Sequence, residues 1–136
     1  MIKPIMKSEF FLRLPSEDAG PDDAATGQDL LDTLNEHEHE CVGLAANMIG
    51  VRKRIICVKD GNRTLLMYNP QILEQVNAYQ TSEGCLSLTG ERPCTRYRRI
   101  KVEYLDENFV HRIKNFSGYT AEIIQHEIDH CRGIVI

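Results

Sequence analysis

Two histidines and a glutamate near the end of the chain form its clearest chemical pattern. In the stretch EIIQHEIDHCRG, positions 122–133, His126 and His130 are four residues apart, and Glu127 follows the first of them. Residues four apart lie on one face of a helix, so the two imidazoles can bind a single divalent metal ion. Glu127 is then placed to exchange a proton with a water at that ion. The pattern therefore predicts a metal-dependent hydrolytic site.

The segment that carries these residues has the features of a helix over about 118–132. One helical face holds Tyr119, Ile123, His126 and His130, and an apolar stripe lies beside it. Ser117 is a suitable N-cap, and Gly133 is a suitable C-terminal stop. A chance match on a surface helix would show the same pattern. However, both histidines fall on the side expected to be buried, where an uncoordinated imidazole would need another partner.

A hydrolytic metal site needs a third protein ligand, and the residues alone leave several candidates. They are Cys85 in SEGCLSL, His37 with Cys41, His111, and Cys131. Cys131 points about 100° away from His130 around the helix, and His111 lies in an alternating, solvated strand. Cys85 is preferred because Gly84 lets the backbone approach a ligand closely, although spacing alone does not decide among them.

Length and charge limit the possible classes of protein. A chain of 136 residues with 42% apolar content fits a single domain over residues 1–136. A net charge of -4 argues against a general nucleic-acid-binding surface, and the basic run from Arg92 to Lys101 is interpreted as an exposed strand face. We find neither a membrane-spanning apolar stretch nor a signal peptide, so we expect a cytoplasmic protein. The five cysteines lack a disulfide-like spacing, and Cys57 in RIICV is expected to be core filling.

The pattern of elements predicts an α+β fold. An extended loop over 13–28 leads into a helix over about 28–38, and VGLAANMIG is expected to form a turn. Strands are predicted at 52–58, 64–70, 72–78 and 100–105, with a hairpin turn at 106–108. We therefore expect mostly antiparallel β-sheets packed around the C-terminal HExxH helix, together with an N-terminal helix.

Three segments, taken in order, resemble the peptide deformylase family. They are Gly43-Leu44-Ala45-Ala46, then Glu83-Gly84-Cys85-Leu86-Ser87, then His126-Glu127-Ile128-Asp129-His130. YNP at 68–70 is also similar to the corresponding family segment, so the resemblance extends over nearly the whole chain. It implies that Cys85, His126 and His130 are metal ligands and that Glu127 is the general acid and base. The implied metal is one divalent ion per chain, ferrous iron in the cell, with zinc or nickel as replacements in purified samples.

The implied reaction is hydrolysis of the formyl group from the N-terminal formylmethionine of nascent polypeptides, with release of formate. The implied oxyanion donors are the backbone N–H of Leu86 and a glutamine at the end of the first motif. This chain departs from that motif: Cys41 stands in place of a glycine, and Met48 stands in place of the glutamine. A thioether cannot donate a hydrogen bond, so we expect an attenuated enzyme unless Asn47 or another group replaces the donor.

The resemblance also suggests where substrate binds. The implied substrate-binding residues are Val42, Gly43, Leu44, Glu83, Gly84, Arg92, Tyr119 and Ile123, and Gly43 offers backbone groups to an extended peptide. The chain stops six residues after His130, where many members of the family continue into another helix. We expect this difference to affect transient ribosome association more than hydrolysis. The alternatives are a related enzyme that acts on another N-acyl substrate and a metal-binding protein that has lost catalysis.

Overall fold

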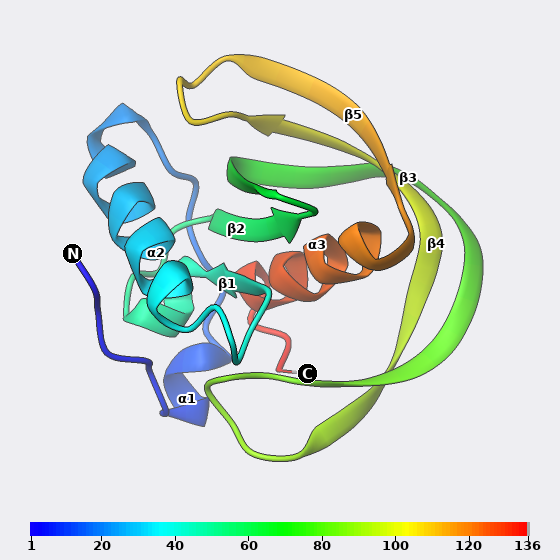
Figure 1. The fold of residues 1–136 in the computed structure, drawn as a ribbon, viewed down its shortest axis with the longest axis horizontal. Coiled ribbons are helices and arrows are strands. Elements are labelled where there is room, and N and C mark those ends of the chain that lie inside the picture. The colour runs from blue at the N-terminus through cyan, green and yellow to red at the C-terminus, as the bar shows by residue number, and fades with distance from the viewer. Residues whose placement is uncertain (136) are drawn as a thin grey trace.

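The computed structural model describes residues 1–135 and confirms the α+β class. In chain order it contains α1 (Glu9–Leu12), a 3-10 turn (Pro21–Asp23), α2 (Ala24–Glu36), β1 (Gly43–Ala45), a second 3-10 turn (Ala46–Ile49), β2 (Ile55–Asp60), β3 (Arg63–Gly84), β4 (Glu91–Leu105), β5 (His111–Ser117) and α3 (Gly118–Cys131). Helix α3 lies between the short strands β1 and β2 on one side and the long β3–β4 hairpin on the other (Figure 1).

The strands form one antiparallel sheet in the order β1-β2-β3-β4-β5. Its centre is the pairing of β3 with β4, which curves around α3 (Figure 1). The register shifts between Tyr68 and Gln71 and again between Ile72 and Glu74. Such irregularities bend a strand and increase its twist, which lets this hairpin wrap around a helix.

Two predicted strands are one strand in the structure. The sequence predicted a stop at Asn69 and Pro70, but β3 continues through both residues to Gly84. Asn69 has a positive φ of 53°, and the first register shift falls across this dipeptide. The irregularity removes the need for a ladder hydrogen bond from Pro70, which has no N–H to donate. Strand β4 also begins earlier than predicted, at Glu91 rather than Ile100.

Other predicted bounds change by a few residues. Helix α2 begins four residues before the predicted position and ends at Glu36, so the NEHEHEC stretch lies mainly after the helix. Strand β2 begins at Ile55 rather than residue 52. The predicted turn at VGLAANMIG instead contains β1 and the second 3-10 turn. The hairpin turn at 106–108 is confirmed.

Helix α3 matches its prediction closely. It spans Gly118–Cys131 with Ser117 as its N-cap, and Gly133 takes a positive φ of 76° just after its end. The Gln125 amide bonds both backbone groups of Tyr97, with the side-chain oxygen accepting at 2.8 Å and the nitrogen donating at 2.8 Å. These bonds fix the helix against β4, while Ile124 and Ile128 are buried in the core. The helix is therefore held firmly enough to position side chains for chemistry.

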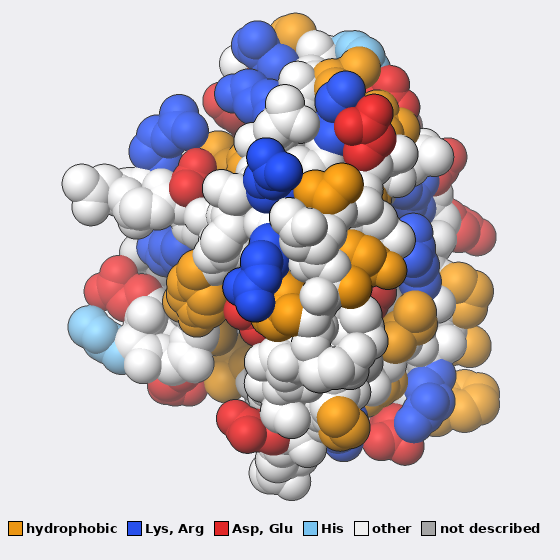
Figure 2. Space-filling model, turned by 90° about the vertical axis from the view of Figure 1, so that its right-hand side faces the viewer, with side chains coloured by type: hydrophobic (Ala, Val, Ile, Leu, Met, Phe, Trp, Pro, Cys, Tyr) orange, Lys and Arg blue, Asp and Glu red, His pale blue; other side chains and the backbone are white. Residues whose placement is uncertain are grey.

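The outer face of the hairpin explains most of the basic run. Figure 2 shows Lys and Arg side chains spread over this face among single hydrophobic residues. Arg98 and Arg99 are exposed as predicted, but Arg96 is buried. No helix within residues 1–135 is long and apolar enough to span a membrane.

Candidate metal centre and active site

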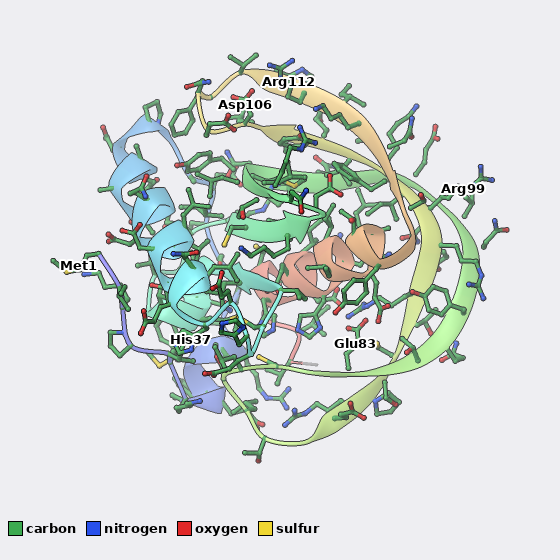
Figure 3. All side chains as sticks on the ribbon, viewed as in Figure 1. Met1, His37, Glu83, Arg99, Asp106 and Arg112 are labelled. Carbon is green, nitrogen blue, oxygen red and sulfur yellow. The ribbon has the colours of Figure 1, made fainter. Side chains whose placement is uncertain are left out.

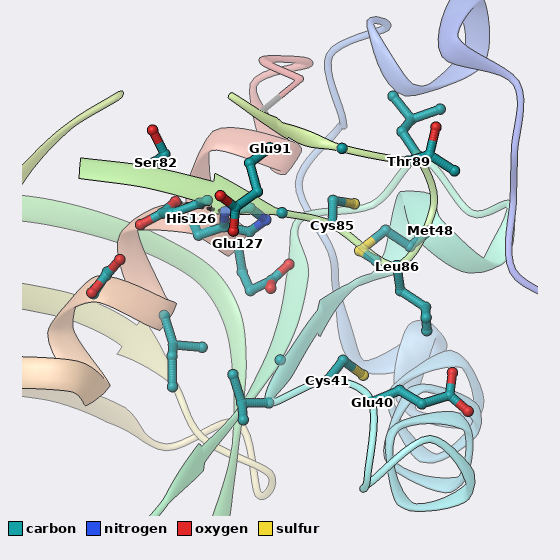
Figure 4. A pocket seen from close by; sticks show the side chains of 18 of the residues that line it. Glu40, Cys41, Met48, Ser82, Cys85, Leu86, Thr89, Glu91, His126 and Glu127 are labelled. Carbon is teal, nitrogen blue, oxygen red and sulfur yellow. Dashed lines mark hydrogen bonds and ion pairs between the residues drawn. The ribbon is translucent and has the colours of Figure 1, made fainter. Parts of the chain in front are cut away.

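The three predicted ligands meet at one point. Potential ligand atoms of Cys85, His126 and His130 all lie within 4.8 Å of one another. The two histidine Nε2 atoms are 3.2 Å apart, as expected for residues one helical turn apart on α3. Cys85 comes directly after β3, at the point where the chain turns toward β4. The hairpin therefore brings the thiol close to His126, which lies 41 residues later in the sequence (Figure 4).

The chemistry of this donor set fits a divalent transition metal. One sulfur and two imidazole nitrogens suit zinc, iron or nickel better than magnesium or calcium. Burial raises the pKa of Cys85, but hydrogen bonds with His126 and His130 outweigh it and lower the pKa to about 5. Burial lowers the pKa of His126, but hydrogen bonds with Cys85 and Glu83 outweigh it and raise the pKa to about 10. The hydrogen bonds with the two histidines thus favour the thiolate of Cys85, which is the form that binds a metal.

The orientation of His126 depends on Glu83, a residue that also lines the cavity. Glu83 was expected to contact substrate, but its Oε1 atom is 2.7 Å from His126 Nδ1 (Figure 3 shows Glu83 between β3 and α3). This contact turns Nε2 toward Cys85 and His130. A carboxylate behind a ligating histidine fixes the ring and its tautomer.

Arg96 holds Glu83 in position behind His126, and this role was not predicted from the sequence. Its guanidinium donates to both carboxylate oxygens of Glu83 and, at 2.7 Å, to Asp129 Oδ2. Burial raises the pKa of Glu83, but its hydrogen bonds with His126 and Arg96 hold that pKa well below the usual range. One clue to Arg96 in the sequence was that two of the motifs contain an acidic side chain, Glu83 and Asp129, that needs a basic partner.

This arrangement predicts different effects for two similar substitutions. We expect Glu83→Gln to weaken metal binding by about 10- to 100-fold, because it removes the carboxylate that orients His126. Asp129→Asn also removes a charged partner of Arg96 but leaves the contact with His126 in place, so metal affinity should change by less than about threefold. Competition with a chromogenic chelator measures both affinities. Equal losses in the two variants would contradict this role for Glu83.

Glu127 lies beside the three converging ligands and faces the cavity (Figure 4). It is 4% exposed, and within residues 1–135 its Oε1 atom has no hydrogen-bond partner. Burial raises the pKa of Glu127, and the neighbouring histidines oppose that effect. Gly43 on β1 provides the space for this carboxylate, because a Cβ at that position would lie 3.0 Å from Glu127 Oε2 and 2.7 Å from Ile123. A buried carboxylate with a free oxygen is suited to accepting and returning a proton.

A cavity of about 770 Å³ opens over this cluster. It is lined by most of the predicted site residues, namely Val42, Gly43, Met48, Glu83, Gly84, Cys85, Leu86, Tyr119, Ile123, His126 and Glu127. Tyr119 contributes from an exposed position, with 65% of its surface accessible. Leu88 also lines the cavity and is only half-buried.

Two predicted substrate-binding residues are placed elsewhere. Leu44 is fully buried in the core, because alternation along β1 turns it away from the cavity. Arg92 is half-buried and lies 3.9 Å from Glu9 in an ion pair rather than in the cavity lining. Neither side chain forms a wall of the cavity in this structure.

Met48, which stands in place of the glutamine of the family motif, has a defined set of contacts in the structure. Met48 is buried and lines the cavity, and its sulfur accepts a hydrogen bond from Ala45 N–H at 3.5 Å. Asn47 does not replace the expected glutamine, because its amide donates to the His130 carbonyl oxygen at 2.9 Å and is fully buried. The hypothesis that Asn47 supplies the donor is therefore wrong for this structure.

The alternative metal ligands do not join the cluster. Within residues 1–135, the only group of three or more potential ligands is Cys85 with the two histidines of α3. His37 pairs with Glu40 at 3.3 Å, and His111 pairs with Glu103 on the surface. Cys57 and Cys131 are buried, and burial raises the pKa of both thiols.

Comparisons with known proteins agree with this geometry. The sequence profile of the polypeptide deformylase family matches residues 7–136. A peptide deformylase from Clostridium beijerinckii is 52% identical over 136 residues and covers the whole of both chains. A second relative, peptide deformylase 1 from Clostridium perfringens, is 38% identical over 79% of this chain and 74% of its own.

Solved structures show the same architecture. The peptide deformylase from Thermus thermophilus superimposes with a TM-score of 0.89 at 33% identity, covering 99% of this chain and 84% of that one. A class I type b peptide deformylase from Acinetobacter baumannii, solved with Met-Ala-Ser bound, gives 0.89 at 28% identity and covers 99% and 97%.

Proposed function

The chain belongs to the peptide deformylase family, metal-dependent hydrolases that remove the formyl group from formylmethionine peptides, and we propose that its metal-holding residues are Cys85, His126 and His130. The observation that carries this assignment is the convergence of their three ligand atoms beside the buried carboxylate of Glu127, whose Oε1 atom has no hydrogen-bond partner among the described residues. A divalent ion at this position supplies Lewis-acid activation of water and of the formyl carbonyl.

Residues of the chain carry out the proton transfers and stabilise the oxyanion. Glu127 takes a proton from the attacking water at its free Oε1 atom and returns it to the amide nitrogen as the C–N bond breaks. In this proposal the Leu86 N–H donates to the oxyanion, which is supported by the position of Leu86 directly after Cys85 and in the cavity lining. Lys7 donates to the Leu86 carbonyl oxygen at 2.7 Å and so holds this turn in place.

Met48 limits the rate in this proposal, because the position of a second oxyanion donor carries a thioether. We expect Met48→Gln to raise kcat by about tenfold or more, since removing one such donor typically costs about a hundredfold. Glutamine and methionine are similar in volume, so the cavity should keep its shape. Initial rates of formate release at saturating substrate measure the effect. A change of less than twofold would show that another group already serves the oxyanion.

The metal in the cell is ferrous iron in this proposal, and zinc and nickel are replacements. Thiolate ligation explains an expected sensitivity to oxygen, because Fe(II) bound by cysteine is readily oxidised. Reconstitution of metal-free protein with each ion under anaerobic conditions, followed by exposure to air, tests this point. The iron form should lose activity in air while the nickel form keeps it.

The substrate is the N-terminal formylmethionine of nascent chains. Its side chain can be received by the apolar lining of the cavity, to which Val42, Leu86 and Ile123 contribute. A related enzyme acting on another N-acyl group is the alternative, and matched peptides separate the two. Formyl-Met-Ala-Ser should release formate at least about a hundredfold faster than acetyl-Met-Ala-Ser releases acetate, because the larger acyl group must fit beside Cys85 and Glu127. Preferential deacetylation would favour the alternative.

The setting of this reaction is also part of the proposal. We expect the protein to act in the cytoplasm on chains emerging from ribosomes, with transient ribosome association, and to have no sequence-specific contact with nucleic acid. The net charge of -4 supports the last expectation.

A further inference from the structure

The turn between β3 and β4 carries two groups of the proposed site but has little support of its own. It runs over residues 85–90, begins with the proposed metal ligand Cys85, and continues with Leu86, the proposed oxyanion donor. Apart from the pairing of β3 with β4, the backbone of this turn makes a single hydrogen bond to other parts of residues 1–135. That bond comes from Lys7, whose Nζ atom donates to the Leu86 carbonyl oxygen at 2.7 Å.

The other polar groups of the turn do not replace this bond. The Ser87 N–H donates to Cys85 Sγ at 3.4 Å, so that contact stays inside the turn. The Ser87 hydroxyl is buried, but within the described part of the chain it has no hydrogen-bond partner. A segment with so few backbone hydrogen bonds opens locally at low cost in free energy. The orientation of Leu86 therefore depends on two fixed points, the Cys85 thiol on one side and Lys7 on the other.

Lys7 itself is held from both directions along the chain. The N–H of Met6 donates to the Met48 carbonyl oxygen at 2.7 Å, which ties the segment to the first motif. Ser8 is the N-cap of α1, and its side chain accepts a hydrogen bond from a backbone N–H of that helix at 3.2 Å. Leu12 of α1 is fully buried, and Figure 1 shows the helix beside the turn between β3 and β4. The N-terminal segment thus links the first motif to the second.

The missing donor at Met48 increases the demand on this link. In the proposed reaction the Leu86 N–H is the remaining backbone donor to the oxyanion, so an error in its direction is not compensated by a glutamine. Of the lysines and arginines in residues 1–135, only Lys7 lines the catalytic cavity. Its ammonium group therefore also contributes positive charge close to the place where negative charge develops.

Resting on the proposed function, we propose that Lys7 is a positioning residue for hydrolysis. Its ammonium group fixes the Leu86 carbonyl, and the Leu86 N–H is thereby directed at the oxyanion. Small displacements matter here, because a shift of about 1 Å in a catalytic group can cost about a hundredfold in rate. The oxyanion forms only in the transition state, so loss of this support should lower kcat and leave KM nearly unchanged.

Replacing Lys7 by methionine keeps a long unbranched side chain and removes its hydrogen-bond donors. With formyl-Met-Ala-Ser as substrate, we expect Lys7→Met to lower kcat by about tenfold and to change KM by less than about twofold. Lys7→Arg can donate to the same carbonyl oxygen, so its kcat should stay within about threefold of the wild-type value. A kcat for Lys7→Met equal to that of the wild-type protein would overturn the proposal, as would a loss that Lys7→Arg does not restore.

Lys3→Met is the matched control, because it removes the same charge from the same segment. The Lys3 side chain lies 4.0 Å from Asp29 and does not line the catalytic cavity. Its kcat and KM should equal those of the wild-type protein. A tenfold loss in Lys3→Met would attribute the effect to the charge of the segment and would overturn the role of the bond to Leu86.

Backbone ¹⁵N relaxation of the zinc-loaded protein tests the same bond without any measurement of activity. The order parameter of the Leu86 N–H should be near about 0.85 in the wild-type protein and in Lys3→Met, and below about 0.6 in Lys7→Met. If the wild-type protein releases no formate, the proposed function is wrong, and the order parameters alone decide whether Lys7 fixes the turn. A rigid Leu86 in Lys7→Met would overturn the inference even if kcat falls.

Discussion

Replacing Glu127 with alanine is expected to lower kcat for formate release by about a thousandfold while metal content stays at one ion per chain. General acid and base catalysis by a positioned group contributes about 10²- to 10⁴-fold, and Glu127 is the buried carboxylate beside the ligands that has a free oxygen. Its side chain is not one of the three converging ligands, so its removal should spare metal binding. Stopped assays of formate from formyl-Met-Ala-Ser, together with elemental analysis of the same sample, measure both quantities.

Glu107→Ala provides the matched control, because Glu107 is exposed in the turn between β4 and β5. Its kcat should equal that of the wild-type protein. If Glu127→Ala kept more than a tenth of wild-type activity, another group would have to move the proton, and the assignment of Glu127 would fail.

Replacing Cys85 with alanine is expected to have the other large effect, the loss of both metal and activity. Removal of one of three protein ligands leaves only two imidazoles, which hold a divalent ion far more weakly than the full set. We expect metal content after dialysis to fall from about one ion per chain to less than about 0.1. Formate release should fall in proportion.

Cys41→Ala is the control for this experiment. The Cys41 thiol lines the same cavity but does not belong to the converging group, so its loss should leave metal content near one ion per chain. Loss of metal in Cys41→Ala with retention in Cys85→Ala would place the ion elsewhere in the cavity.

Local patterns predicted much of the fold from sequence. The bounds of α3 were predictable because its helical spacing, its N-cap and its terminal glycine all agree. The long hairpin was less predictable, because Asn69 and Pro70 usually end a strand, and only the pairing with β4 shows that this one continues through an irregularity. The early start of α2 depended on the 3-10 turn at Pro21–Asp23, which no periodic pattern marks.

The candidate site, like the fold, was predictable from the sequence only in part. The sequence identified Cys85, His126 and His130 together, but largely through resemblance, because spacing could not select Cys85 among the candidate ligands. The support behind His126 was not predictable, since the partnership of Glu83, Arg96 and Asp129 joins β3, β4 and α3. A buried arginine inside a basic run is indistinguishable from its exposed neighbours until the strand is paired and one face is covered.

The most direct test of the account is a metal titration of the metal-free protein with formate release as the readout. Ferrous iron is added anaerobically in fractions of an equivalent, and formyl-Met-Ala-Ser is the substrate. We predict a rate that rises linearly to one ion per chain and then stays constant, with no rise for Cys85→Ala. A chain that releases no formate at any loading, or releases it equally well without metal, would contradict the account.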